Sequence, residues 1–385
     1  MIIERELNVK LQSLLKVFPV VILTGCRQCG KSTLLKHLLP NYTYISLEDL
    51  DVRQLALEDP RHFISVYQKN VIIDEIQQVP QLLSYIQTHV DAVNESGMYV
   101  LTGSHNFLLM QSISQSLAGR TALLTLAPFS ISELNSKKKL PATVNEMLFK
   151  GNFPRIYDKK IEPTDFYPSY ISTYVERDVR LLKNISDFSA FNRFLKLCAG
   201  RCSQILNVSA LAEDAGINRK TAESWLSVLE TSYIIYFLKP YYKNFGKRLI
   251  KNPKLYFYDT GLVTSLLGIT DSNQMESFYM RGALFENLVV SELLKRRLFE
   301  GKTDELYFWR DSNGVEIDVL EENGTELFAY EIKASETMNT AFFSNIKKVK
   351  EIAHLSLKNT AIIYGGEKNI PSSETQGAYI SWKNL

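Results

Sequence analysis

The stretch that decides the fold is VVILTGCRQCGKSTLLKHLL, residues 20–39. It begins with aliphatic residues typical of a buried strand, continues as the polar loop Gly25–Thr33, and ends in a pattern typical of a helix. The loop matches G-x-x-x-x-G-K-[ST], in which the two glycines let successive backbone N–H groups point at phosphate oxygens. The sequence therefore predicts a strand, a phosphate-binding loop and a helix in direct succession.

The side chains of this loop predict a site for ATP and Mg²⁺. Lys31 is expected to reach the β- and γ-phosphates, and the hydroxyl of Ser32 to bind Mg²⁺. Thr33 either adds a phosphate contact or supports the first helical turn. The remaining loop residues are expected to line the nucleotide: Gly25, Cys26, Arg27, Gln28, Cys29 and Gly30. Because this backbone must wrap an anion, its two cysteines cannot also close around zinc, and we expect them to pack in a reducing cytoplasm.

A second acidic element follows the loop along the chain. The run Val71-Ile-Ile-Asp-Glu ends in two acids, as a central parallel strand ends at the ligand edge of a sheet. Asp74 is expected to hold Mg²⁺ through water, and Glu75 to polarise the attacking water. A P-loop followed by such a strand predicts an ATPase.

Another strand, residues 98–102, ends in Gly-Ser-His-Asn and brings small polar groups to the same edge. Ser104 is a candidate sensor of the γ-phosphate, although a serine there can equally cap the next helix. Strands and helices alternate up to the charged loop at 135–139, which predicts a doubly wound parallel sheet over residues 1–135.

Composition agrees with a multidomain globular chain. Its 385 residues are 45% hydrophobic and 22% charged, with a formal net charge of +2. The amino terminus has no uninterrupted apolar core and no run reaches membrane-spanning length, so we expect a cytoplasmic protein without a membrane partner. Residues 170–260 hold 14 Lys or Arg against 8 Asp or Glu, a local excess that is compatible with a polyanion surface or with ordinary solvated lysines.

Several segments resemble a bacterial and archaeal group of AAA-type ATPases whose C-terminal domain is uncharacterised. The resemblance is carried by LTGSHN, SLAGRTALLTLAPFSISEL, GNFP, YVERDV, KNPKLYFYDTGL and RGALFE. It implies an AAA-type core and a homo-oligomer in which Arg120 approaches a phosphate, in the same or a neighbouring subunit, as an arginine finger. The same arginine can instead neutralise a helix dipole, and Arg155 and Arg177 are rivals for the finger.

The middle third has helix-turn-helix spacing. In residues 205–239 a short helix meets a turn at Gly216, and a second helix begins near Asn218 with Arg219 and Lys220 at its exposed start. A basic, aromatic segment follows, with Lys243, Lys247, Arg248, Lys251 and Lys254. We predict a winged-helix module that contacts DNA; a winged helix used for packing or protein contact is the alternative.

The last third predicts a small α/β domain with acidic strands. Asn323-Gly324 is a favoured hairpin turn, and period-two alternation directs Glu331 and Lys333 to one face, opposite Asp318. With Glu286 on the preceding helix, this set is similar to the PD-(D/E)XK nuclease signature. The resemblance implies a second Mg²⁺ or Mn²⁺ held by Glu286, Asp318 and Glu331, with Lys333 catalytic; a solvated hairpin or an inactive module is the alternative.

These expectations combine into an α/β protein with four parts. We predict an AAA-type P-loop core over residues 1–135, a helical connection over 136–185, a winged-helix module over 186–270 and a restriction-endonuclease-like domain over 271–385. The predicted activity is ATP hydrolysis coupled to nucleic-acid processing. A regulatory or scaffolding switch, with a C-terminal domain that performs no chemistry, is the rival.

Overall fold

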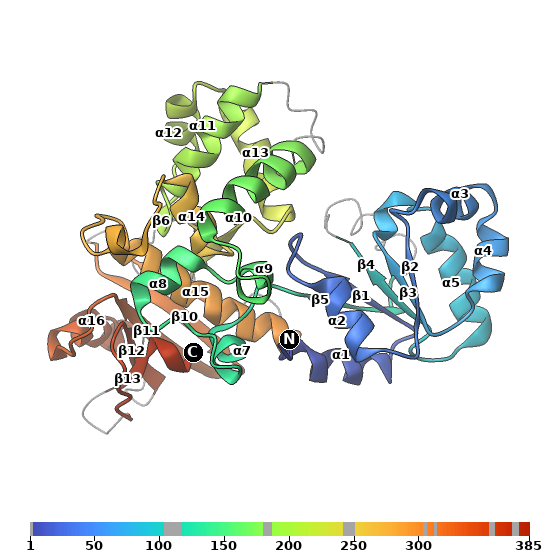
Figure 1. Ribbon diagram of the computed structural model, residues 1–385. Coiled ribbons are helices and arrows are strands. Elements are labelled where there is room, and N and C mark those ends of the chain that lie inside the picture. The colour runs from blue at the N-terminus through green and yellow to red at the C-terminus, as the bar shows by residue number, and fades with distance from the viewer. Residues whose placement is uncertain are drawn as a thin grey trace. The chain divides into compact units, whose positions relative to one another are not determined.

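The computed structural model describes residues 3–103, 117–179, 187–241, 251–302, 306–311, 314–353, 359–371 and 377–385. The chain divides into two compact units (Figure 1). The first unit comprises Met1–Phe129, Thr231–Tyr233 and Arg297–Lys302, and the second comprises Ser130–Glu230, Ile234–Arg296 and Thr303–Leu385. Among the described residues, no helix is both long and apolar enough to cross a membrane.

The first unit is built on a parallel sheet. Its described elements are α1 (Leu7–Leu15), β1 (Val20–Thr24), α2 (Lys31–Leu38), β2 (Thr43–Ser46), α3 (Leu50–Glu58), α4 (Pro60–Val66), β3 (Val71–Asp74), η1 (Ile76–Gln78), α5 (Leu82–Val93), β4 (Tyr99–Thr102) and β5 (Thr121–Thr125). The strands pair in the order β2-β3-β4-β1-β5, all parallel. The predicted parallel α/β core is confirmed.

Burial explains why aliphatic residues dominate the central strands β1, β3 and β4. Every residue of β1, β3 and β4 is buried, as expected for a parallel sheet whose two faces are covered. On one face a continuous core joins β1, β3 and β4 to α3, α4 and α5, and α5 contributes Leu82, Leu83, Ile86 and Val90 at helical spacing. Because the strands are parallel, their carboxyl ends meet at one edge, where the ligand side chains lie.

The second unit begins with helices and continues into a large mixed sheet. Its described elements are α7 (Ile131–Ser136), α8 (Val144–Lys150), α9 (Pro154–Asp158), α10 (Pro163–Tyr170), η2 (Ile171–Val179), α11 (Phe188–Ala199), β6 (Gln204–Ile205), α12 (Val208–Ala215), α13 (Arg219–Thr231), β7 (Ile235–Pro240), β8 (Lys254–Phe257), α14 (Thr260–Leu266), η3 (Ser272–Met275), α15 (Arg281–Phe299), β9 (Leu306–Arg310), β10 (Glu316–Asn323), β11 (Glu326–Lys333), η4 (Thr340–Phe343), α16 (Ser344–Ala353), β12 (Thr360–Tyr364), β13 (Ala378–Ser381) and η6 (Trp382–Asn384). The strands pair in the order β13-β12-β11-β10-β9-β7-β8-β6.

This sheet joins two predicted domains. Strand β7 pairs with β8 on one side and, through Lys239 and Pro240, with β9 on the other. The predicted boundary at residue 270 therefore falls inside one compact unit. The predicted hairpin is present, because Asn323 pairs with Glu326 and Gly324 has φ 63°.

Candidate functional site

The phosphate loop is shaped by two glycines. Gly25 has φ 137°, and a Cβ there would lie 2.0 Å from the carbonyl oxygen of Leu126. Gly30, with φ 99°, precedes α2 directly. A side chain at Gly25 would clash with the backbone, and one at Gly30 would strain its left-handed conformation. The two glycines therefore let the loop run from β1 into the helix N-terminus as the motif requires. Within this loop Cys26 and Cys29 are buried, Arg27 and Gln28 are half-buried, and Thr33 is exposed.

Lys31 lies inside the loop. Its side chain is buried, and its ammonium donates hydrogen bonds to the carbonyl oxygens of Gly25 at 2.9 Å and Cys26 at 3.0 Å. The charge is thus held at the centre of the backbone that would surround phosphate oxygens. The structure places Lys31 where the motif predicts it.

Arg5 supports the loop from behind, a contact that the motif does not indicate. Its buried guanidinium donates to the carbonyl oxygens of Cys29 at 2.9 Å and Ala127 at 2.7 Å. Burial raises the pKa of Cys29, but a hydrogen bond with Cys26 and the charges of Lys31 and Arg5 outweigh it and lower the pKa to about 6. Two cations, the Lys31 ammonium and the Arg5 guanidinium, therefore lie against the loop and favour a bound anion.

Ser32 and Asp74 meet at the ligand edge. The Ser32 hydroxyl donates to Asp74 Oδ2 at 2.6 Å, across the gap between α2 and the end of β3. A hydroxyl and a carboxylate in contact fit Mg²⁺, which prefers hard oxygen ligands, keeps several waters and is completed by substrate phosphates. These two residues would hold the ion when nucleotide binds.

Asp74 has two further partners that the sequence did not single out. The hydroxyls of Tyr44, in β2, and Thr102, the last residue of β4, both donate to its carboxylate. Burial, a hydrogen bond to Asp74 and the charge of Asp74 raise the pKa of Tyr44, which stays a neutral donor. Thr102 has one sequence signal, a polar residue at the carboxyl end of a strand, whereas Tyr44 is the second residue of β2 and has none. The sheet order β2-β3-β4 turns that signal into contact.

Glu75 follows Asp74 directly and has an unusual backbone. Its φ of 57° and ψ of 47° lie in the left-handed region, which a residue other than glycine adopts rarely and often at functional sites. Its carboxylate accepts a hydrogen bond from the Gln77 side chain. Glu75 begins a sharp turn directly after Asp74, at the carboxyl end of β3.

Arg120 lies at the opposite edge of the sheet. It precedes β5, and Thr121 pairs with Val20, whereas the loop follows Thr24 at the far end of β1. About 13 Å of strand therefore separates the two. The guanidinium is bound to Asp91, with Nη2 donating to Oδ2 at 2.9 Å. A finger directed at its own nucleotide was therefore wrong; contact with a neighbouring subunit stays a prediction. Ser104 lies outside the described residues.

The predicted helix-turn-helix segment contains two helices at the expected positions. Asn207 caps α12, Gly216 ends it with φ 71°, and Asn218 accepts a hydrogen bond from the Thr221 N–H at the start of α13. Arg219 and Lys220 are exposed there, and Arg219 Nε donates to Glu223 at 2.8 Å. Residues 242–250, with Lys243, Lys247 and Arg248, lie outside the described part of the chain.

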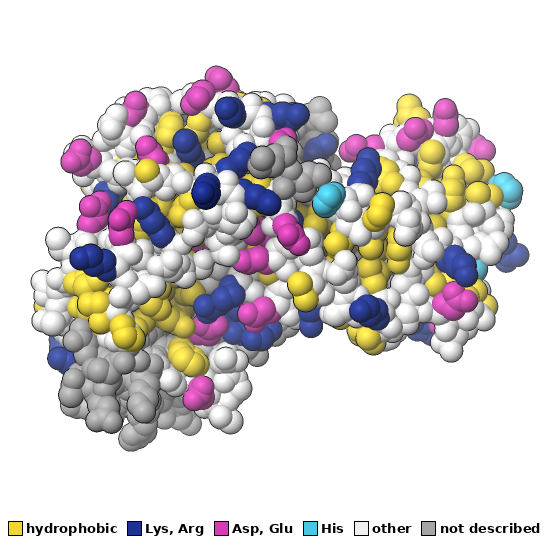
Figure 2. All heavy atoms as spheres, turned by 60° about the horizontal axis from the view of Figure 1, so that its bottom comes forward, with side chains coloured by type: hydrophobic (Ala, Val, Ile, Leu, Met, Phe, Trp, Pro, Cys, Tyr) yellow, Lys and Arg dark blue, Asp and Glu magenta, His cyan; other side chains and the backbone are white. Residues whose placement is uncertain are grey.

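Lys254 was expected to belong to an exposed basic wing, and this expectation is wrong. Its side chain is buried rather than exposed. On the face that Figure 2 displays, basic side chains lie among acidic ones.

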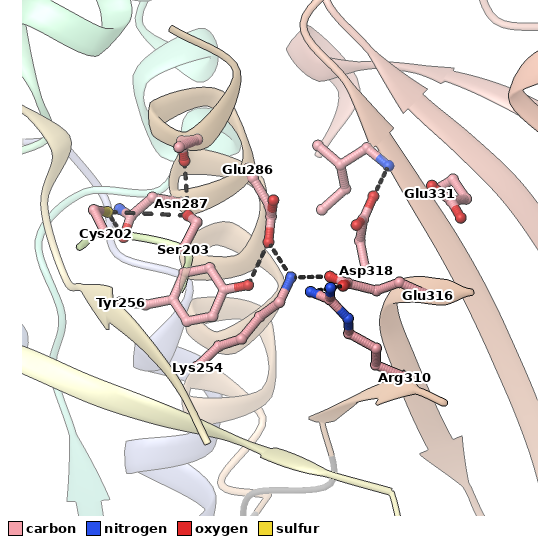
Figure 3. Close-up of polar contacts among 12 residues, drawn as sticks. Cys202, Ser203, Lys254, Tyr256, Glu286, Asn287, Arg310, Glu316, Asp318 and Glu331 are labelled. Carbon is pink, nitrogen blue, oxygen red and sulfur yellow. Dashed lines mark hydrogen bonds and ion pairs between the residues drawn. The ribbon is translucent and has the colours of Figure 1, made fainter. Parts of the chain in front are cut away.

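The C-terminal acids do come together, but in ion pairs (Figure 3). Glu286 Oε1 accepts from Lys254 Nζ at 2.9 Å and from the Tyr256 hydroxyl at 2.6 Å. Lys254 also pairs with Glu316, which accepts from Arg310 at 3.0 Å. Burial raises the pKa of Glu286 to about 7 against the lowering effect of Lys254.

The other two predicted acids are held by Lys333. Its ammonium lies 2.8 Å from Glu331 Oε2 and 3.7 Å from Asp318 Oδ2, so the predicted shared face of these three residues is confirmed. Burial and the charge of Asp318 raise the pKa of Glu331 to about 8. Among the described residues, no group of three or more His, Cys, Asp or Glu is arranged to hold a metal. The expected metal site of Glu286, Asp318 and Glu331 is corrected accordingly, because ammonium groups occupy the spaces between the carboxylates.

Comparison with known proteins finds a separate family model for each of three parts of the chain. Residues 141–273 and 281–384 match two families described as domains of unknown function, DUF8612 and DUF4143. Two proteins described as uncharacterized, from Mycobacterium bovis and Mycobacterium tuberculosis, are each 29% identical over 381 residues, which is 97% of this chain and 83% of theirs. A Walker-type ATPase of Pyrococcus abyssi is similar over 69% of this chain and 96% of its own, with 16% identity and a TM-score of 0.47.

The first unit has a named match. Residues 17–135 match the family model described as AAA domain, which spans the phosphate loop, Asp74 and Glu75. This part of the chain is an AAA-type, P-loop ATPase-like domain.

Proposed function

We propose that the chain binds ATP with Mg²⁺ and hydrolyses it at the carboxyl ends of β1 and β3. The observation that carries the proposal is the 2.6 Å contact between Ser32 and Asp74, with Glu75 directly after Asp74 and Lys31 inside the loop. A loop that only bound an anion would need neither the metal ligands nor an acid at the next position. Together these groups supply the three parts that phosphoryl transfer needs: phosphate binding, a metal site and an oriented water.

Each side chain has a separate task in this reaction. Backbone N–H groups of the loop and the Lys31 ammonium donate to the phosphates, while the Ser32 hydroxyl and the Asp74 carboxylate hold the metal and its waters. Mg²⁺, when bound, neutralises charge on the β- and γ-phosphate oxygens. Glu75 orients a water for attack on the γ-phosphorus and accepts its proton. The bond from this phosphorus to the β–γ bridging oxygen breaks, giving ADP and inorganic phosphate.

Phosphate release with purified protein tests the proposal. Wild type should hydrolyse ATP only when Mg²⁺ is present. Lys31→Ala should raise the Kd for ATP at least about tenfold, because it removes a charge-assisted contact to the phosphates. Lys16→Ala, at the exposed end of α1, removes the same charge away from the phosphate loop; it is the matched control and should behave as wild type. Equal turnover in wild type and Lys31→Ala would mean that the measured activity comes from a contaminant or another site.

We also propose duplex DNA as a partner of the second unit. The order of α11, β6, α12, α13, β7 and β8, with an antiparallel sheet β7-β8-β6, is the order found in winged-helix modules. The exposed Arg219 and Lys220 at the start of α13 support this reading, since recognition helices present their first turn to DNA. Salt-sensitive binding of a labelled duplex by the full chain is expected; binding that is absent at low salt contradicts a DNA role.

A further inference from the structure

A buried lysine lies at the centre of the C-terminal carboxylates. Lys254 is 3% exposed, and its ammonium forms ion pairs with Glu286 on α15 and Glu316 on β10. Figure 3 shows the ammonium between these two carboxylates, with the Tyr256 hydroxyl on the same oxygen of Glu286. The lysine enters from β8, so it connects three elements of the second unit. A cation therefore already lies between the Glu286 and Glu316 carboxylates.

The lysine cannot easily leave this place. Its aliphatic stem is enclosed, and its ammonium lies 5.6 Å from the centre of the Phe308 ring. Asn287, the neighbour of Glu286, bonds both the N–H and the carbonyl oxygen of Phe257, which fixes α15 against β8. Withdrawing Lys254 would leave the Glu286 carboxylate without its ion-pair partner in a buried environment, which is strongly unfavourable. The arrangement is therefore rigid on the side of Glu286.

The charges of the cluster are also nearly balanced. Four carboxylates, those of Glu286, Glu316, Asp318 and Glu331, meet three cations, those of Lys254, Arg310 and Lys333. At most one formal negative charge remains, which is too little to attract a divalent ion that must also displace bound ammonium groups. The Asp318 carboxylate also accepts a hydrogen bond from the Ile332 N–H, at 2.7 Å from its Oδ2, so this oxygen already has a donor.

We propose that the Lys254 ammonium replaces the divalent cation of a nuclease-like site, so that the second unit binds neither Mg²⁺ nor Mn²⁺ at these carboxylates and does not cleave phosphodiesters. The residues that resemble a nuclease signature then form a fixed, charge-balanced cluster that joins β8, α15 and β10. This inference is independent of the proposed ATPase, whose residues lie in the first unit.

Mn²⁺ binding to nucleotide-free full-length protein tests the inference, measured by electron paramagnetic resonance. A Ser32→Ala background removes the metal ligand of the phosphate loop. In that background we expect no saturable Mn²⁺ site. Adding Lys254→Met, which keeps the stem and removes the charge, should create one saturable Mn²⁺ site per chain. Adding Glu286→Gln as well should abolish it.

Lys333→Met is the matched control, because it removes one positive charge from the same cluster and leaves Lys254 in place. It should create no such site. An equal gain in Lys333→Met would show that net charge, rather than the position of Lys254, decides, and would overturn the inference. Thermal unfolding checks that every variant is folded. If Lys254→Met does not fold, Lys254→Gln replaces it in the same measurement.

A second test leaves Lys254 unchanged and measures Mn²⁺ binding at the wild-type cluster. If the Ser32→Ala protein binds Mn²⁺ and loses it on Asp318→Asn, the inference is wrong. Cleavage of supercoiled DNA, single-stranded DNA or RNA that Lys333→Ala abolishes would equally contradict it. No cleavage with either metal and no Asp318-dependent Mn²⁺ binding is the expected result.

Discussion

Asp74 is the residue around which the nucleotide site is organised. Its buried carboxylate accepts hydrogen bonds from three hydroxyls, those of Ser32, Tyr44 and Thr102. Three donors from three different elements hold both oxygens in place before any metal binds. A metal ligand that is fixed in this way loses little freedom on binding, so the supporting hydroxyls contribute to metal affinity.

Removing one supporting hydroxyl should weaken Mg²⁺ binding without removing a ligand. We expect Tyr44→Phe and Thr102→Val each to raise the Mg²⁺ concentration for half-maximal ATP turnover by about tenfold, since outer partners of metal ligands typically contribute this much. Tyr42→Phe is the matched control, because the Tyr42 hydroxyl donates to the carbonyl oxygen of Gly97, which precedes β4 and so lies at the end of that strand opposite Thr102. Turnover measured over a Mg²⁺ titration checks this. An unchanged Mg²⁺ dependence in both variants would mean that these hydroxyls do not position Asp74.

Sequence reasoning could locate Lys31, Ser32, Asp74 and Glu75 because each belongs to a local pattern. It could not locate Tyr44, because a tyrosine in a short strand carries no motif. Contact with Asp74 depends on β2 lying beside β3, which is a property of strand order. Lys254 was misplaced for a similar reason: it follows a basic segment along the chain, but β8 is an inner strand of the sheet and directs it inward.

At the level of elements, Asp259 connects three segments of the second unit. Its buried carboxylate accepts from the Asn152 N–H at 2.6 Å, the Tyr167 hydroxyl at 2.7 Å and the Leu262 N–H at 2.9 Å, so it links α10, α14 and the turn after α8. It is therefore both the cap of α14 and a buried tertiary contact. Burial raises the pKa of this carboxyl in spite of the three donors.

We expect Asp259→Ala to lower the free energy of unfolding of the second unit by about 3 kcal/mol or more, because three buried donors lose their acceptor. Asp187→Ala is the matched control. Asp187 also caps a helix, α11, but it is exposed, and among the described residues its carboxylate accepts from the Ala190 N–H, so about 1 kcal/mol is expected. Urea unfolding of the full chain measures both. Equal costs would show that the tertiary contacts of Asp259 contribute nothing beyond a cap.

The start of α13 gives a second prediction at this scale. Arg219→Ala should weaken duplex binding and flatten its salt dependence by about one phosphate contact. Glu223→Ala should strengthen binding, because Glu223 pairs with Arg219 and adds negative charge to the same face. Fluorescence anisotropy over a salt series measures both variants. Weaker binding in Glu223→Ala would contradict the assignment of this face to DNA.

At the scale of the whole molecule, the parallel core was predictable and the second unit only in pieces. Alternating strands and helices with a phosphate loop predict the first unit, because each βα element carries its own signal. The eight-stranded sheet depends on the pairing of β7 with β9, which brings together residues 239–240 and 307–308. No local pattern encodes such a distant pairing. The sequence therefore predicts separate modules over 186–270 and 271–385, and the structure joins strands from both ranges in one continuous sheet.

Separating ATP binding from ATP hydrolysis tests the central claim most directly. Glu75→Gln keeps the size of the side chain and removes only its charge and basicity. ATP affinity, measured by equilibrium binding with Mg²⁺, should stay within about threefold of wild type, while single-turnover hydrolysis should fall by about 10²- to 10⁴-fold, the usual contribution of a general base. Hydrolysis at the wild-type rate by a variant that binds ATP normally would contradict the account.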